Sequence, residues 1–119
     1  MAPMSSFAVH IPDADLEPEP LDAGSILEGT PETTGVVLFE SADGTITRGL
    51  WQCTPGKVTD VEADEMFVVV SGRATIEFED GASIEVGPGD VCVLEEGART
   101  VWTIHETLRK AYQILLPAS

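Results

Sequence analysis

The chain has few basic residues. Only six Lys and Arg stand against 21 Asp and Glu in 119 residues, which gives a formal net charge of −15 at pH 7. Nucleic acids and anionic membrane surfaces are bound through clusters of basic side chains, so this composition excludes both as partners. All six cations lie between Arg48 and Lys110, and any anionic group of a ligand must be met there.

The sequence also has no long apolar run and no basic region followed by an apolar one at its N-terminus. A membrane-spanning helix needs about 20 mostly apolar residues, and a secretory signal needs the second pattern. We therefore expect a cytoplasmic protein. Its two cysteines, Cys53 and Cys92, are far apart in sequence, and we expect them to be reduced thiols.

A helical period is missing too, whereas strand patterns are frequent. Residues 74–79 alternate apolar and polar side chains, Asp80-Gly81 follows as a turn, and residues 82–86 alternate again, which predicts an antiparallel hairpin. Further strands are predicted at residues 35–40, 45–54, 65–71, 91–94, 100–104 and 108–116. Short strands between Gly and Pro turns are typical of an all-β sandwich or barrel.

The first residues differ in composition from the rest. Residues 1–29 are acidic and rich in proline, which favours an extended, poorly packed arm ahead of a single domain at residues 30–119. A short strand along a sheet edge, in this chain or across a dimer, is one alternative for the arm, and a disordered tail is the other. The apolar residues that support the strand are Phe7, Val9, Ile11 and Leu16.

Glu65 is separated from Gly72 by six residues, and Pro88-Gly89-Asp90 follows further along the chain. These segments resemble the first motif and the start of the second motif of the small single-domain cupins. Further segments resemble the subgroup related to ureidoglycine aminohydrolase and the ethanolamine-utilisation cupin: Gly49-Leu50-Trp51, Pro55-Gly56, Asp64-Glu65, Ser71-Gly72-Arg73-Ala74, Trp102 and Arg109-Lys110-Ala111-Tyr112. The resemblance covers roughly residues 30 to 117. It implies a cupin jelly roll, a β-barrel or sandwich of antiparallel strands.

The resemblance also implies a metal site that this sequence cannot complete. Cupins that hold a metal usually do so with two His and the Glu of the first motif plus one His of the second. Here the second-motif His position is Thr100, and the first pair is matched by Glu62 and Asp64 or by neighbours such as Asp60. The chain has two His in total, so the usual three-His centre cannot form within one chain.

Strand alternation predicts which side chains point into the barrel. An inward Glu65 places Phe67 on the same face, and the last strand then presents Lys110 and Tyr112. Apolar walls with a few polar groups are typical of a small-ligand site. The predicted ligand-binding residues are Trp51, Cys53, Glu65, Phe67, Thr100, Trp102, Lys110 and Tyr112.

Several of these residues have a structural alternative. Glu65 and Lys110 either form a buried ion pair with each other, or Lys110 binds a substrate carboxylate while Glu65 holds a metal or moves a proton. Glu62 and Glu65 are a tentative ligand pair for a divalent ion such as magnesium or manganese, and a solvated rim is the alternative. Cys53 is favoured as a core residue, and His105 is expected to face outward.

The predicted function is the binding of a small polar metabolite in the barrel without the usual three-His metal centre. Whether the protein is an enzyme stays open. One alternative is a metal-dependent lyase, isomerase or aminohydrolase with carboxylate-rich ligation, and the other is a non-catalytic dimeric regulatory module. A homodimer is expected because residues 66–70 are apolar on both faces of one strand, although the N-terminal arm could cover the second face instead.

Overall fold

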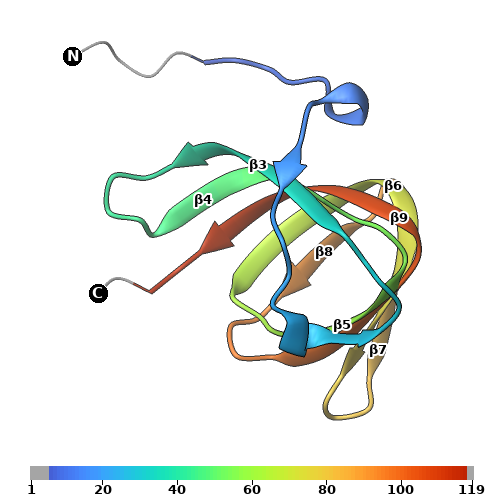
Figure 1. Ribbon diagram of the computed structural model, residues 1–119. Helices are drawn as coiled ribbons and strands as arrows, with labels where there is room; N and C mark the ends of the chain where they lie inside the picture. Colours follow the sequence, from blue (N-terminus) through green and yellow to red (C-terminus); the bar gives the residue numbers. More distant parts are fainter. Residues whose placement is uncertain (1–5, 118–119) are drawn as a thin grey trace.

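The structure is a computed structural model that describes residues 6–117, and it consists almost entirely of antiparallel strands (Figure 1). No α-helix occurs in this range, and no helix there is long and apolar enough to cross a membrane. The all-β prediction is confirmed. The elements are η1 (Ile11–Asp13), β1 (Glu17–Pro18), η2 (Ala23–Ser25), β2 (Ile26–Glu28), β3 (Thr33–Glu40), β4 (Ile46–Cys53), β5 (Gly56–Val61), β6 (Asp64–Phe78), β7 (Ser83–Val86), β8 (Val91–Leu94) and β9 (Arg99–Leu115).

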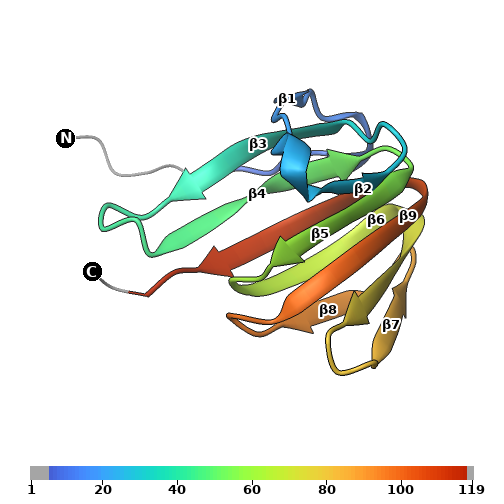
Figure 2. The same cartoon turned by 60° about the horizontal axis from the view of Figure 1, so that its bottom comes forward.

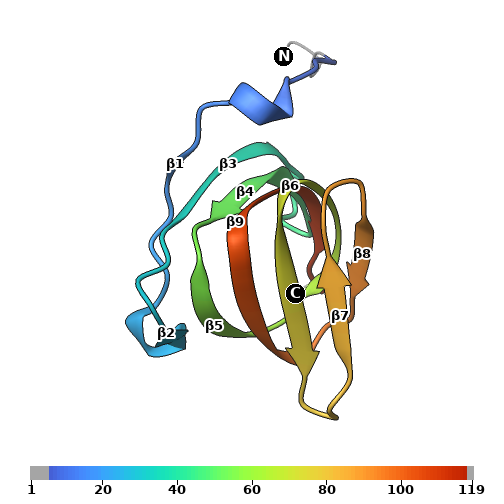
Figure 3. The ribbon, with the colours of Figure 1, turned by 90° about the vertical axis from the view of Figure 1, so that its right-hand side faces the viewer.

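Two long strands organise the sheet. β6 and β9 pair antiparallel from Asp64 opposite Leu115 to Phe78 opposite Thr100. The other edge of β9 pairs with β4 and β5, and the other edge of β6 pairs with β8 and β7. Figure 2 shows β3, β4 and β9 side by side, and Figure 3 shows β6 and β9 curving around an interior. The curved sheet turns one face of every long strand towards that interior.

The sequence analysis predicted four shorter strands where these two run without interruption. The predicted break near residue 72 is a bulge, because Gly72 has a φ of +85° and the register with β9 shifts between Val69 and Ala74. The bulge changes which residues face inward, from odd numbers at Phe67 and Val69 to even numbers at Ala74 and beyond. β5 was not predicted, because its polar residues obscure the alternation.

The predicted turn at Asp80-Gly81 is present, and a second turn joins β7 to β8. Asp80-Gly81 joins β6 to β7, where the backbone N–H of Ala82 donates to Asp80 Oδ1 at 2.9 Å. The segment from Gly87 to Asp90 closes on itself, because the backbone N–H of Gly87 donates to Asp90 Oδ2 at 2.8 Å. It therefore serves as a structural turn.

The N-terminal segment lies against the sheet on the side of β3 and β5 (Figure 3). A strand within residues 7–16, one of the two alternatives for the arm, does not form; the edge strand is β1, and a 3-10 turn at Ile11–Asp13 precedes it. Arg109 fastens this turn, because its Nη1 donates to the carbonyl oxygens of Ile11, Pro12 and Ala14 at 2.7, 3.4 and 3.1 Å. The segment is thereby placed beside the open side of the barrel.

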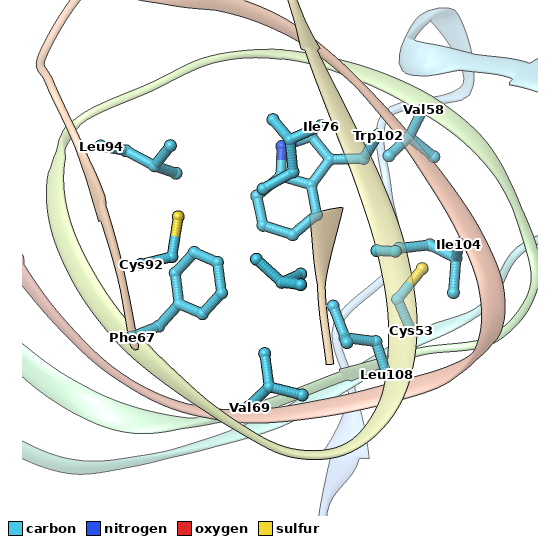
Figure 4. Close-up of a cluster of buried hydrophobic side chains, with 12 residues drawn as sticks. Cys53, Val58, Phe67, Val69, Ile76, Cys92, Leu94, Trp102, Ile104 and Leu108 are labelled. Atoms are coloured by element: carbon cyan, nitrogen blue, oxygen red, sulfur yellow. The ribbon is translucent and has the colours of Figure 1, made fainter. Parts of the chain in front are cut away.

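The core fills the interior of the curved sheet (Figure 4). Both cysteines lie in it as free thiols. Burial raises the pKa of Cys53 to about 11, although the charge of Lys110 opposes this, so Cys53 stays protonated and unsuited to nucleophilic chemistry. The buried cluster comprises Cys53, Val58, Phe67, Val69, Ala74, Ile76, Val86, Cys92, Leu94, Trp102, Ile104 and Leu108.

The outer face of β6 and β8 carries apolar side chains. Met66 and Val68 are 47% and 41% exposed, and Val93 is 70% exposed, whereas Phe67 points inward. Phe7 and Val9 share a shallow outer groove with Met66 and Val68, so the N-terminal segment covers this face in part. The strand is therefore buried on one face only within the single chain.

Replacing Gly72 with alanine should destabilise the fold strongly. The new Cβ would lie 1.9 Å from the carbonyl oxygen of Thr107, and alanine disfavours the positive φ as well. We expect a loss of at least about 3 kcal/mol in the free energy of unfolding, measured by urea denaturation.

Gly81→Ala is the matched control, because Gly81 also has a positive φ but no atom lies near its added Cβ. It should lose only about 1–2 kcal/mol. Equal losses for the two variants would show that the close contact of the bulge with Thr107 contributes nothing.

Candidate functional site

A pocket of about 470 Å³ opens between the barrel and the N-terminal segment. β4, β5, β6 and β9 supply its walls, and the segment around β1 and η2 supplies its outer rim. Both tryptophans and the single tyrosine of the chain line it. The lining residues are Glu19, Leu21, Asp22, Ser25, Trp51, Val58, Thr59, Asp60, Glu62, Glu65, Trp102, Lys110, Tyr112 and Ile114.

An ion pair lies at the inner end of this pocket. Lys110 Nζ donates to Glu65 Oε2 at 2.6 Å, and each side chain is only 7% exposed. The sheet brings them together because Lys110 on β9 pairs with Val69 on β6. Glu65 lies on the same inner face of β6 as Val69. The alternative of a buried ion pair is therefore what the structure shows. Burying two charges has a desolvation cost that only close pairing offsets.

Three aromatic rings surround the ammonium group. Lys110 Nζ lies 4.7 Å from the ring centroid of Trp51, 4.3 Å from that of Phe67 and 4.9 Å from that of Trp102. The negative faces of aromatic rings attract a cation, and the attraction is strongest where water is excluded. Trp51 and Trp102 meet edge to face at 6.1 Å, which keeps this cage together.

Glu62 holds a second polar network. Its Oε2 accepts a hydrogen bond from Thr100 Oγ1 at 2.6 Å and another from Trp102 Nε1 at 2.9 Å. Glu62 is only 5% exposed, and these two donors lie next to each other on the inner face of β9. The carboxylate therefore fixes the indole of Trp102 in the pocket wall.

Asp60 precedes this network on the same face of β5 as Val58. Burial is the main cause that raises its pKa to about 6, and the nearby carboxylate of Glu62 adds to the rise. The two carboxyl groups lie close enough to share a proton. Asp60 is thus a group whose charge changes near neutral pH at the pocket mouth.

Two glycines make room for pocket residues on the β3 and β4 side. A Cβ at Gly49 would lie 2.6 Å from the Tyr112 hydroxyl, and one at Gly35 would lie 2.6 Å from a Glu19 carboxylate oxygen. Burial, with Glu19 and Glu65 nearby, raises the pKa of Tyr112. Tyr112 therefore presents a neutral hydroxyl.

Five predicted site residues meet in this pocket: Trp51, Glu65, Trp102, Lys110 and Tyr112. The other three, Cys53, Phe67 and Thr100, are at most 2% exposed and lie in the core beneath it, because their side chains pack against other barrel residues. His105 lies on the surface, as expected, where its Nε2 meets Thr75 Oγ1 at 2.8 Å.

The sequence analysis missed the rim that the N-terminal segment supplies. Glu19, Leu21, Asp22 and Ser25 all line the pocket, although the composition of their segment favoured a poorly packed arm. Gly35 is the signal that could have indicated this, because a glycine inside a strand often marks the close approach of another part of the chain.

The donor set does not fit the metal centre that the fold family implies. Glu65, the residue matched to a ligand, is paired with Lys110, and the second-motif position holds Thr100, whose hydroxyl donates to Glu62. Among residues 6–117 no three His, Cys, Asp or Glu side chains are grouped so that they could hold a metal ion. The tentative pairing of Glu62 with Glu65 as ligands therefore has no geometric support, because each already has its own partner.

Glu65→Gln should reduce stability by about 3–5 kcal/mol, because it leaves the Lys110 charge buried without a counter-charge. A Glu65→Leu/Lys110→Met double variant should recover most of this loss, since an apolar pair of similar size needs no desolvation of charge. Urea denaturation measures all three proteins.

Glu106→Gln serves as the control for breaking an exposed pair. Glu106 binds Arg73 at 2.5 Å with both side chains 59% exposed, so its loss should be under about 1 kcal/mol. If Glu65→Gln lost as little stability as this control, the burial of the Lys110 charge would not depend on Glu65.

Known structures of similar shape include two that are named as cupins. A protein with unknown function from Pseudomonas syringae pv. tomato is 28% identical with a TM-score of 0.77, over 86% of this chain and 45% of that chain. This chain thus spans less than half of that protein. The EutQ protein of Clostridium difficile is 13% identical with a TM-score of 0.69, over 91% of this chain and 85% of the other.

A putative ethanolamine utilization protein Q from Salmonella typhimurium is 18% identical with a TM-score of 0.61, over 88% of this chain and 96% of the other. At such identities these two likenesses show the fold alone. No curated protein matches the chain.

The family model described as the EutQ-like cupin domain matches residues 40–112. This range holds β4 to β8, most of β9 and the residues of the ion pair. The prediction of a small cupin with the jelly-roll fold, related to the ethanolamine-utilisation cupin, is confirmed. The chain belongs to the family of EutQ-like cupin domains.

Proposed function

We propose that this protein binds a small polar metabolite in the barrel pocket and does so with side chains alone. The observation that carries the proposal is the pocket of about 470 Å³ in which apolar and aromatic walls surround a few fixed polar groups. This volume and this mixture are typical of sites for small organic molecules.

The fixed geometry of the pocket supports the same proposal. Trp102 is oriented by Glu62, and Lys110 is oriented by Glu65 and three rings, so neither has to be ordered when a ligand arrives. Preorganised groups raise affinity because less conformational entropy is lost on binding. Trp51 and Tyr112 then provide the contact surface nearer the mouth.

A cytoplasmic location is part of this proposal. Cys53 and Cys92 are both free and buried, which suits a protein kept in a reducing compartment.

A screen of small carboxylates, ureides, sugars and amines tests the proposal. A ligand in this pocket should raise the melting temperature and change the tryptophan fluorescence, because both tryptophans line the site. Trp51→Ala should weaken binding roughly fivefold or more, corresponding to about 1 kcal/mol of lost aromatic contact. Trp102 remains as the fluorescent reporter in that variant.

Phe39→Ala is the control, because Phe39 lies outside the pocket, where the guanidinium of Arg48 stacks 5.0 Å from its ring centroid. A ligand that stabilises the protein without changing the fluorescence, or that binds Trp51→Ala and Phe39→Ala equally well, would place the binding site elsewhere.

We also propose that the protein is a homodimer that pairs through the outer face of β6 and β8. Exposed apolar side chains gather there on paired strands, and this supports the proposal because such patches on soluble proteins are often interfaces. The residues of this outer face are Met66, Val68, Val91 and Val93, which are 41% to 70% exposed.

Val93→Glu tests the dimer, because this side chain is 70% exposed and its replacement should leave the fold of one chain intact. Light scattering should give twice the chain mass for the native protein and a single chain mass for the variant. Val61→Glu, at a 55% exposed position on β5, should stay dimeric. A native protein that is monomeric at micromolar concentration would contradict the proposal.

A further inference from the structure

The pocket holds many more carboxylates than cations. Lys110 is the one Lys or Arg among its lining residues, and it is already paired with Glu65. The carboxylates of the pocket are Glu19, Asp22, Asp60, Glu62 and Glu65. The site therefore has an excess of negative charge that Lys110 does not balance.

The other cations of the chain are engaged elsewhere. All six Lys and Arg lie within residues 6–117, so each can be placed. Lys57 pairs with Glu28, Arg73 with Glu106 and Arg99 with Glu79. Arg48 binds Gln113, and Arg109 binds Gln52 and the carbonyl groups of the N-terminal segment. Within this range, then, no Lys or Arg forms an ion pair with Asp60 or Glu62.

One buried oxygen of Glu62 has room for a donor. Its Oε2 accepts from Thr100 and Trp102, whereas its Oε1 receives no hydrogen bond from any side chain or backbone group of residues 6–117. Every fully buried polar side-chain atom in the described chain has a partner, so Oε1 is open to the pocket. A carboxylate that is 95% buried thus lines the cavity with one oxygen that accepts no N–H or O–H donor, beside the Asp60 carboxyl group with which it can share a proton.

The walls favour an organic group over a hydrated metal ion. Leu21, Val58 and Ile114 are apolar lining residues, and Trp51 and Tyr112 add aromatic surface. The inner end of the same pocket already stabilises an ammonium group among aromatic rings at 4.3 to 4.9 Å. Ammonium and guanidinium groups combine a positive charge with an attached apolar body, which suits these walls.

Building on the proposed function, we propose that the metabolite is a small organic cation whose ammonium or guanidinium head group binds between Asp60 and Glu62. Its apolar body then lies along Trp51 and Tyr112. The head group donates hydrogen bonds to Oε1 of Glu62 and to the Asp60 carboxylate. Its positive charge balances the negative charge of these two carboxylates.

The charge of Asp60 makes this binding depend on pH. A proton competes with the cation for the Asp60 carboxylate, whose pKa is about 6 in the folded protein. Affinity should therefore rise as the pH increases from 5 to 8, by about tenfold, because only a minority of the carboxylates is ionised at the lower pH. The charged groups that line the pocket with Asp60 are Glu19, Asp22, Glu62, Glu65 and Lys110, and those that line a hollow on its other side are Lys57, Glu77, Glu79 and Arg99.

A series of probes with the same alkyl group tests the charge of the ligand. Butylammonium, butylguanidinium, butanol and butyrate are titrated into the full chain at pH 8 and pH 5, with tryptophan fluorescence and melting temperature as readouts. We expect the two cations to bind at least about tenfold more tightly than butanol, which lacks a charge-assisted hydrogen bond, and we expect butyrate not to bind.

Asp60→Asn should weaken the binding of the cations by about tenfold or more and should remove the difference between pH 5 and pH 8. Asp15→Asn is the matched control: Asp15 is exposed, lies outside the pocket, and the substitution makes the same change in charge. It should bind the cations as the native protein does. Equal affinities in the two variants would overturn the assignment to Asp60.

The other outcomes separate this inference from the proposed function. If butanol, butyrate or a neutral metabolite binds and changes the fluorescence while the cations do not, the pocket is a ligand site but the ligand is not a cation. If magnesium or manganese ions alone bind and Asp60→Asn abolishes their binding, the site is a metal site and the inference is wrong. If no probe and no screened metabolite binds, both proposals fail.

Discussion

The buried ion pair between Lys110 and Glu65 is the interaction on which the pocket depends. It connects the neighbouring strands β6 and β9 on their inner faces, and the rings around the ammonium group come from β4, β6 and β9. A slip of one residue in either long strand would turn one charge outward and leave the other buried alone, at a cost of several kcal/mol. The pair therefore favours one register, and that register places both tryptophans in the pocket wall.

In this chain Glu65, which the family resemblance would make a metal ligand, binds the Lys110 ammonium group instead. The positions matched to the His ligands hold Thr100 and residues such as Glu62. Thr100 donates to Glu62, and Glu62 in turn holds the indole of Trp102. The centre of the barrel is thus a network of fixed charges and hydrogen bonds with an acidic mouth, which suits selective binding by charge and shape. Such a site needs no bound ion to keep its side chains in place.

Strand alternation was sufficient to predict the inner face of the two long strands, because side-chain direction there repeats every two residues. It placed Glu65, Lys110 and Tyr112 on the inside, and pairing of the two charges was one of its alternatives. It could not predict that β6 continues through the bulge at Gly72, because a glycine with positive φ also ends strands. Composition in turn could not predict that Glu19 lines the pocket. It describes how the N-terminal segment behaves alone, whereas hydrogen bonds from Arg109 hold that segment against the barrel.

The most direct test of this account is a nuclear magnetic resonance measurement on the lysine side chains. The chain has only two lysines, and Lys57, whose side chain is 33% exposed, is an internal reference for Lys110. Aromatic rings at 4.3 to 4.9 Å should shift the ε-methylene protons of Lys110 clearly upfield of those of Lys57. The buried ammonium should also exchange its protons more slowly with water. Identical shifts and exchange rates for the two lysines would contradict a caged Lys110 paired with Glu65.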